Sequence, residues 1–254
     1  MYAGSITEYI DVAQLVLYAF WIFFAALIYY LHRENKREGY PLETDPPSPT
    51  YFEGFPRVPD PKTYKLAHGG EFSAPNDKRD TRPVNGTSVG GYPGAPLEPN
   101  GDPMTAGIGP GSWAERADTP DLTLEGAAKI VPMRVATDFT IAEGDPDPRG
   151  MAVIGADGAQ GGTVSDVWVD RSEVLIRYFE VDTGKRRVLL PHNFAKVHGD
   201  RGEIRVQSIF GAHFAQVPGT KSPDQVTFLE EEKIVAYYGA GTLYADPSRA
   251  EPLF

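Results

Sequence analysis

The chain has 254 residues, a length that suffices for one or two domains with a sizeable apolar core. Its formal charge of −11 and its pI near 4.9 argue against nucleic-acid binding, which requires a basic surface. The absence of cysteine excludes disulfides, thiolate metal sites and cysteine nucleophiles, and the five histidines lack the spacing of a zinc motif, so we predict no metal site.

The first predicted element is a membrane span. Residues 12–31, "VAQLVLYAFWIFFAALIYYL", carry no charge, and a helix of this length crosses a hydrocarbon core of about 30 Å. A buried core helix and a signal peptide have similar compositions, but a signal peptide begins with a basic region, and residues 1–11 contain no Lys or Arg. We therefore predict a short N-terminal segment over residues 1–11 and a transmembrane helix over residues 12–32.

Basic residues flank this span on one side only. Arg33, Lys36 and Arg37 follow it, and no basic residue precedes it. The positive-inside rule therefore places the N-terminus outside and everything after residue 31 in the cytoplasm. We expect these three residues to contact membrane lipids or lie at the membrane interface.

Residues 33–120 form the next predicted segment. Fifteen of the 23 prolines lie between residues 41 and 120, a density that disfavours long helices and central strands. A disordered linker is one interpretation. The seven aromatic residues between positions 41 and 120 favour another, an extended stretch draped over a partner protein, because aromatic side chains are common at interfaces (Tyr51, Phe52, Phe55, Tyr64, Phe72, Tyr92, Trp113).

Residues 121–254 are predicted to form a mostly-β domain that ends in a helix. Short apolar runs such as "MAVIGADG", "GGTVSDVWVD", "VLIRYFEVD" and "EIRVQSIF" are bounded by turn residues, a spacing typical of a small antiparallel barrel. The stretch "EEEKIVAYYGAGTLYA" favours a terminal helix. The glycine runs "GIGPGSW" and "GADGAQGG" lack a following GK[ST] and are interpreted as turns, not phosphate loops.

One predicted hairpin, over residues 167–181, carries charge on both faces of its second arm. Strict alternation puts Arg177 on one face and Glu180 on the other, and one of these faces should pack a core. Asp170 and Glu173 stand at the turn, where we expect them within reach of Arg177. Taken alone, carboxylates and a guanidinium at a half-buried turn are interpreted as a structural salt bridge that ties the turn.

Several segments together resemble one family, the H subunit of the purple-bacterial photosynthetic reaction centre. They are "DVAQLVLYAFWIFFAALIYYL" with "REGYPLE", "PDPKTYKLAHGG", "NGDPMTAGIGP", "KIVPMRVATDFTIAEGDPDPRGM", "GTVSDVWVDRSE" and "PDQVTFLEEEKIVAYYGAG". The resemblance covers nearly the whole chain. It implies that the cytoplasmic domain is a PRC-barrel, a small β-barrel.

The resemblance also implies a role. The H subunit is non-catalytic, binds no cofactor of its own, caps the L and M subunits from the cytoplasm and helps to deliver protons to the secondary quinone. Bacteriochlorophylls, bacteriopheophytins, quinones, non-haem iron and carotenoid are held by L and M. An antenna ring, a cytochrome donor and membrane lipids are the other expected partners, and the expected location is the bacterial inner membrane with a periplasmic N-terminus.

The resemblance assigns proton-pathway roles to individual residues. Asp170 and Glu173 match relay carboxylates, and Arg177 matches their partner cation. Tyr40 matches a hydrogen-bond donor or interface anchor where the span emerges, and Lys129 matches a lysine near the proton entrance. Glu230 matches a carboxylate near the quinone-side charge cluster, although an ordinary charge in the first turn of a helix explains it equally well.

The sequence departs from the family in front of Lys129. Well-known members carry a histidine pair there, and this chain has Glu125 and Ala127 instead. Asp121 and Glu125 are therefore candidate proton collectors, or an ordinary acidic loop. PRC-barrels also occur in ribosome-maturation proteins, so the alternative function is a membrane-tethered adaptor that takes no part in proton transfer.

Overall fold

The computed structural model describes residues 4, 6–7, 9–44 and 50–250, which divide between two compact units. Unit 1 comprises residues 1–79 and 91–95, and unit 2 comprises residues 80–90 and 96–254. The segment 33–120, which was expected to be one draped stretch, therefore contributes to both units. Its draping over a partner stays a prediction.

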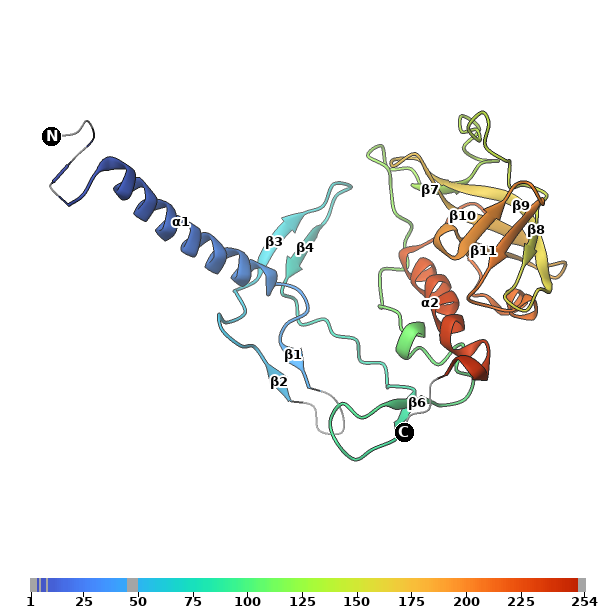
Figure 1. The fold of residues 1–254 in the computed structure, drawn as a ribbon, viewed down its shortest axis with the longest axis horizontal. Helices are drawn as coiled ribbons and strands as arrows, with labels where there is room; N and C mark the ends of the chain where they lie inside the picture. The colour runs from blue at the N-terminus through green and yellow to red at the C-terminus, as the bar shows by residue number, and fades with distance from the viewer. Residues whose placement is uncertain (1–3, 5, 8, 45–49, 251–254) are drawn as a thin grey trace. The chain divides into compact units, whose positions relative to one another are not determined.

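Unit 1 begins with α1, Val12–Asn35, the long blue helix in Figure 1. Asp11 caps its first turn, because the carboxylate accepts a hydrogen bond of 2.7 Å from the backbone N–H of Gln14. No residue of α1 is buried within the chain. Among the described residues it is the one helix that is long and apolar enough to cross a membrane, as the sequence predicts.

The remainder of unit 1 consists of loops and two short antiparallel hairpins. β1, Leu42–Glu43, pairs with β2, Tyr51–Phe52, and β3, Lys62–Lys65, pairs with β4, Glu71–Ala74. Strands this short are consistent with the proline content, since proline cannot donate to a sheet ladder.

Unit 2 opens with a third small hairpin and a 3-10 turn. β5, Gly86–Ser88, pairs with β6, Leu97–Pro99, and η1, Gly109–Gly111, follows. The run "GIGPGSW" is thus a turn, as predicted. η1 packs against the C-terminal helix α2, Phe228–Tyr244, where a Cβ on Gly111 would lie 2.8 Å from the Cβ of Ala240. The glycines therefore permit a close approach of two backbones.

Seven strands form the main sheet of unit 2 (Figure 1). Their order is β11-β10-β9-β8-β13-β12, and β7 pairs with β9. β8 and β13 run parallel and the other neighbours antiparallel, so the predicted small antiparallel barrel contains one parallel pair. The strands are β7 Ile130–Pro132, β8 Ala152–Ile154, β9 Gln160–Asp170, β10 Leu175–Asp182, β11 Arg187–Pro191, β12 Ala195–His198 and β13 Glu203–Val206.

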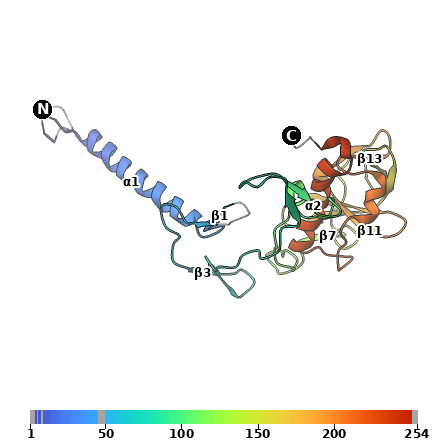
Figure 2. The same ribbon diagram turned by 90° about the horizontal axis from the view of Figure 1, so that it is seen from below.

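The core of unit 2 lies between this sheet and α2. Its largest fully buried side chains are Trp168, Phe179, Phe214 and Tyr238. α2 lies against β11 (Figures 1 and 2). Three short 3-10 helices complete the unit: η2 His192–Phe194, η3 Gly211–Gln216 and η4 Pro247–Arg249. The predicted mostly-β domain with a terminal helix is confirmed.

The expected strict alternation along β10 is wrong. The register with β9 shifts between Ile176 and Tyr178 and again between Glu180 and Val181. Two β-bulges therefore rotate the strand, and its residues 178–181 are all buried, whereas Arg177 is half-buried. A two-residue period cannot survive an extra residue in one strand of a pair.

Candidate functional site: an ionic pocket beside the β9–β10 hairpin

The turn between β9 and β10 is organised by Asp170. Its Oδ1 accepts hydrogen bonds of 2.9 Å from the backbone N–H groups of Ser172 and Glu173, and its side chain is 1% exposed. Val174 follows with φ of 54°, in the left-handed region that β-branched residues rarely adopt. Asp170 thus fixes a strained turn and leaves its second carboxylate oxygen for another partner.

That partner is Lys129, which stands just before β7. Its Nζ lies 3.4 Å from Oδ2 of Asp170, 3.0 Å from Oε1 of Glu173 and 3.5 Å from Oδ2 of Asp121. The hydrogen bond with Glu173, followed by the charge of Asp170, raises the pKa of Lys129 above its ordinary value. Lys129 is therefore a permanent cation at neutral pH, surrounded by three carboxylates.

These residues line one pocket of about 340 Å³, the ionic pocket. Five of the eight predicted proton-pathway residues are among those that line it. The remaining lining residues were not predicted, and four of them are charged or phenolic. The predicted members are Asp121, Lys129, Asp170, Glu173 and Arg177, and the others are Arg116, Ile130, Tyr178, Phe228, Glu231, Glu232 and Val235.

Arg177 lines the ionic pocket but does not have the partner expected from the sequence. Its guanidinium lies 3.6 Å from Oε2 of Glu231 on α2, and Lys129 occupies the place expected for it beside Asp170. The bulge next to Arg177 turns its side chain towards α2. Sequence reasoning missed Glu231, because nothing local indicates which carboxylate of "LEEEK" meets β10.

Glu231 has a second partner in Tyr178. The phenol O–H donates a hydrogen bond of 2.6 Å to Oε2 of Glu231. Burial, reinforced by the negative charge of Glu231, raises the pKa of Tyr178 far above its ordinary value. The phenol therefore stays protonated and keeps this carboxylate in place among the residues that line the ionic pocket.

Glu230 and Glu125 lie outside the residues that line the ionic pocket. Glu230 completes a capping box at the start of α2, since its carboxylate accepts from the backbone N–H of Thr227 at 2.9 Å and from that of Lys221 at 2.7 Å. The helix-start interpretation explains it fully. Hydrogen bonds from its own backbone N–H and from Thr123 lower the pKa of Glu125, a fully exposed carboxylate.

The candidate interface residues of unit 1 turn largely inward. The Nζ of Lys36 donates hydrogen bonds of 2.6 Å to the carbonyl oxygens of Glu53 and Pro56. Lys36 is 2% exposed, which argues against lipid contact and leaves its place at the membrane interface a prediction. Arg37 bonds Glu34 at 2.8 Å and the Asp60 carbonyl at 2.7 Å. The ring of Tyr40 stacks under Lys36, with Nζ 5.0 Å from its centroid. The relay role of Tyr40 and the lipid contact of Arg33 stay predictions.

A second ionic group explains why Glu180 is buried. Arg134 contacts Oε2 of Glu180 at 2.9 Å and Oδ2 of Asp166 at 3.0 Å. Glu180 also accepts hydrogen bonds from Trp168 at 3.1 Å and Ser165 at 2.8 Å. A buried carboxylate with this many donors is a structural element of the barrel.

Comparison with known families gives two matches. Residues 4–135, more than half of the chain, match the family described as photosynthetic reaction centre, H-chain N-terminal region. Residues 141–209 match the PRC-barrel domain, which contains β8 to β13. The first match contains the apolar helix and Lys129, and the second contains Asp170, Glu173 and Arg177. The chain therefore belongs to the H-chain family of the photosynthetic reaction centre.

Proposed function

We propose that this chain caps the L and M subunits from the cytoplasm and passes protons through the ionic pocket towards the secondary quinone. Members of its family are non-catalytic subunits that associate with the L and M subunits. The observation that carries the proposal is the group of three carboxylates around the Lys129 ammonium. One cation among three anions leaves a local excess of negative charge, which attracts protons.

The exposures of these carboxylates suggest the order in which they act. The side chains of Glu173 and Asp121 are 53% and 36% exposed, so both reach water, whereas Asp170 is 1% exposed. Glu173 or Asp121 takes a proton from water and passes it to the buried Asp170, while the Lys129 ammonium stays protonated and holds the carboxylates close together. All three carboxylates contact the same ammonium, so a proton gained by one of them changes the charge that the other two face.

In this proposal the pigments, iron and quinones that carry electrons belong to the L and M subunits. Bacteriochlorophylls, bacteriopheophytins, carotenoid, non-haem iron and quinones are placed in L and M, where the complex would also meet an antenna ring and a cytochrome donor. Full reduction of the secondary quinone consumes two protons from the cytoplasm. The residues of this chain bind and release those protons, and α1 anchors the chain in the bacterial inner membrane with a periplasmic N-terminus.

The substitution Glu173→Gln tests the proposal. Gln keeps the acceptor oxygen for Lys129 and removes the titrating group, so the complex should assemble and make the first electron transfer to quinone normally. The second electron transfer, which is coupled to protonation, should slow about tenfold. This is less than the roughly 10²–10⁴-fold that losing an acid–base group typically costs, because Asp121 offers a bypass. Flash-induced absorbance changes measure both transfers.

Glu143→Gln is the matched control. Glu143 is an exposed carboxylate of the same unit that does not line the ionic pocket, and its loss should leave both transfers unchanged. Small weak acids added to the Glu173→Gln complex should partly restore the second transfer by carrying protons past the gap. Lower thermal stability with an unchanged second transfer would instead make the Lys129 group a structural salt bridge.

A further inference from the structure

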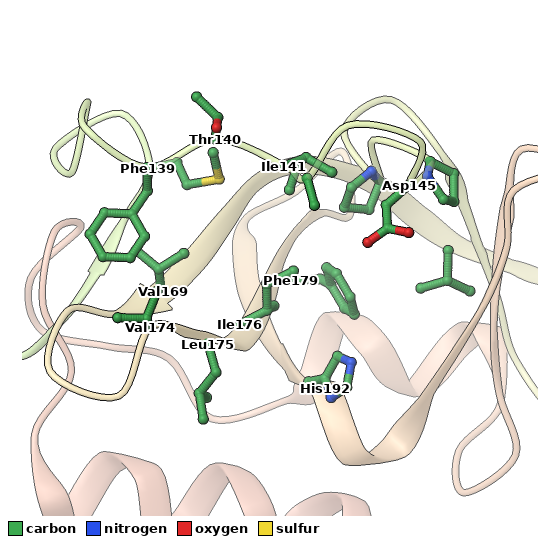
Figure 3. Close-up of a pocket in the computed structure, with 15 residues that line it drawn as sticks. Phe139, Thr140, Ile141, Asp145, Val169, Val174, Leu175, Ile176, Phe179 and His192 are labelled. Atoms are coloured by element: carbon green, nitrogen blue, oxygen red, sulfur yellow. The ribbon is translucent and has the colours of Figure 1, made fainter.

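A second pocket is lined by residues of the same hairpin (Figure 3). This apolar pocket has a volume of about 390 Å³ and lies between the loop 139–148 and the beginning of β10. Phe139 and Ile141 line it from the loop, and Val174 and Leu175 line it from the hairpin. Phe179 and His192, with ring centroids 5.9 Å apart, also line it.

The rim of the apolar pocket exposes apolar side chains to water. Val174 is 73% exposed and Leu175 is 40% exposed, although both lie at the mouth of a preformed cavity. An engineered cavity of about 150 Å³ is large enough for benzene. The apolar pocket therefore has room for a large apolar side chain, and covering its rim would remove Val174 and Leu175 from water.

The loop above the apolar pocket is acidic. Residues 138–149 contain four carboxylates and a single arginine, Arg149, which pairs with Asp147 at 2.6 Å. Within the described part of the chain, no ion pair engages Glu143 or Asp145. Figure 3 shows the Asp145 carboxylate directed towards the pocket. A ligand that fills this pocket should therefore combine an apolar group with a positive charge.

We propose that the apolar pocket receives an apolar side chain from a cytoplasmic segment of the L–M pair, with a neighbouring Lys or Arg paired to Asp145. Cytoplasmic segments of membrane proteins are rich in these basic residues, which matches the acidic loop. The inference rests on the proposed assembly with L and M. Because Glu173 and Val174 are consecutive, seating Val174 against a partner also fixes the position of Glu173 relative to that partner.

The substitution Val174→Asn tests the contact without threatening the fold. Asn tolerates the left-handed backbone of this position better than Val does, so the variant should fold at least as well. Full-length chain in detergent is titrated against an L–M pair stripped of its H chain, and assembly is followed by chromatography. The Kd of Val174→Asn should rise about tenfold, the effect of losing one buried apolar side chain.

Leu124→Asn is the control for the apolar contact. Leu124 is 85% exposed and does not line the apolar pocket, so the Kd of the Leu124→Asn variant for the L–M pair should stay within about twofold of the wild-type value. For the ionic contact, Asp145→Asn should raise the Kd about fivefold at low salt and less at high salt. Asp138→Asn, on the same loop but outside the pocket, should have less than half of that effect.

Wild-type affinity of both Val174→Asn and Asp145→Asn would overturn the proposal. Equal losses for Val174→Asn and Leu124→Asn would also overturn it, because the effect would then be one of general surface hydrophobicity. Self-association of the chain alone that Val174→Asn abolishes would identify a second copy as the occupant. These readouts are affinities, so an unaffected second electron transfer in Glu173→Gln would leave them interpretable.

Discussion

At the scale of the residue, two lysines of this chain show how burial changes what an ammonium does. Lys129 faces three carboxylates at 3.0 to 3.5 Å, so its charge is locally outnumbered. Lys36 faces two carbonyl oxygens and the ring of Tyr40. The first arrangement leaves a local excess of negative charge, and the second attaches a loop to the end of a helix.

Because Lys36 attaches the loop over residues 50–60 to the end of α1, replacing its ammonium should destabilise that loop. Lys36→Met fills a similar volume but leaves the carbonyls of Glu53 and Pro56 without their donor, which should cost about 2 kcal/mol of local stability. Protease cleavage within residues 50–60 should then accelerate roughly thirtyfold. Lys65→Met, at an exposed position of β3, should leave the cleavage rate unchanged. Equal cleavage rates for the two variants would show that the Lys36 ammonium does not hold the loop over residues 50–60 in place.

Tyr178 predicts a dependence of stability on alkaline pH. Its pKa is raised in the folded chain above the ordinary value of 10.0, so the unfolded chain loses the phenolic proton first as the pH rises. Its contribution to stability is therefore complete below pH 10 and declines above it.

Tyr178→Phe should remove that decline. The free energy of unfolding, measured in denaturant between pH 9 and 11.5, should fall less steeply in the variant, by about 1.4 kcal/mol per pH unit at the alkaline end. Below pH 10 the variant should be less stable by about 1–2 kcal/mol, since it lacks the hydrogen bond to Glu231. Identical slopes for the two proteins would place the titration elsewhere, for example in Tyr237 or Tyr238, whose pKa values are also raised by burial.

At the scale of the element, α2 is fixed by a cap at its N-terminus and by close backbone contacts at glycines near its C-terminus. The capping box of Thr227 and Glu230 satisfies the first backbone N–H groups, and glycines further along permit contact with η1 and with Ser208. Glycine in a helix interior costs about 1 kcal/mol relative to alanine. Gly239 is retained against that preference because a Cβ there would press against the Pro110 carbonyl oxygen.

Gly239→Ala should therefore destabilise the chain in spite of its better helix propensity. We expect a loss of about 1–3 kcal/mol in the free energy of unfolding, because a carbonyl of η1 must move. Gly91→Ala, where nothing lies within 4 Å of the added Cβ, is the matched control and should be neutral or slightly stabilising. Denaturant unfolding measures both. A stabilised Gly239→Ala would mean that η1 and α2 separate easily.

At the scale of the whole molecule, the functional chemistry depends on which side of the membrane unit 2 occupies. The basic residues that follow α1 favour the cytoplasm, where proton delivery also requires the ionic pocket to be. Protease added to sealed inside-out vesicles should therefore digest the chain beyond residue 31, and protease added to right-side-out vesicles should leave it intact. The opposite pattern would contradict both the orientation and the proton pathway.

The sequence by itself determined the elements of this protein. The apolar run over residues 12–31, the short strands and the terminal helix follow from local composition and periodicity, and the structure has them close to where they were predicted. The H-chain resemblance, carried by motifs spread along the chain, was confirmed by a match over more than half of it. Local signals also sufficed to mark the turn with Asp170 and Glu173 as unusual.

Only the tertiary structure decided which charges meet. Lys129 and Glu173 are 44 positions apart, and they meet because β7 pairs with the end of β9. Arg177 reaches Glu231 rather than Asp170 because a bulge rotates β10 towards α2. Glu180, equally charged, is enclosed by Arg134 and Trp168 from other strands and loops. Ion-pair partners depend on strand register, bulges and helix packing. Residues that are distant in sequence determine these features together, so no local sequence pattern predicts them.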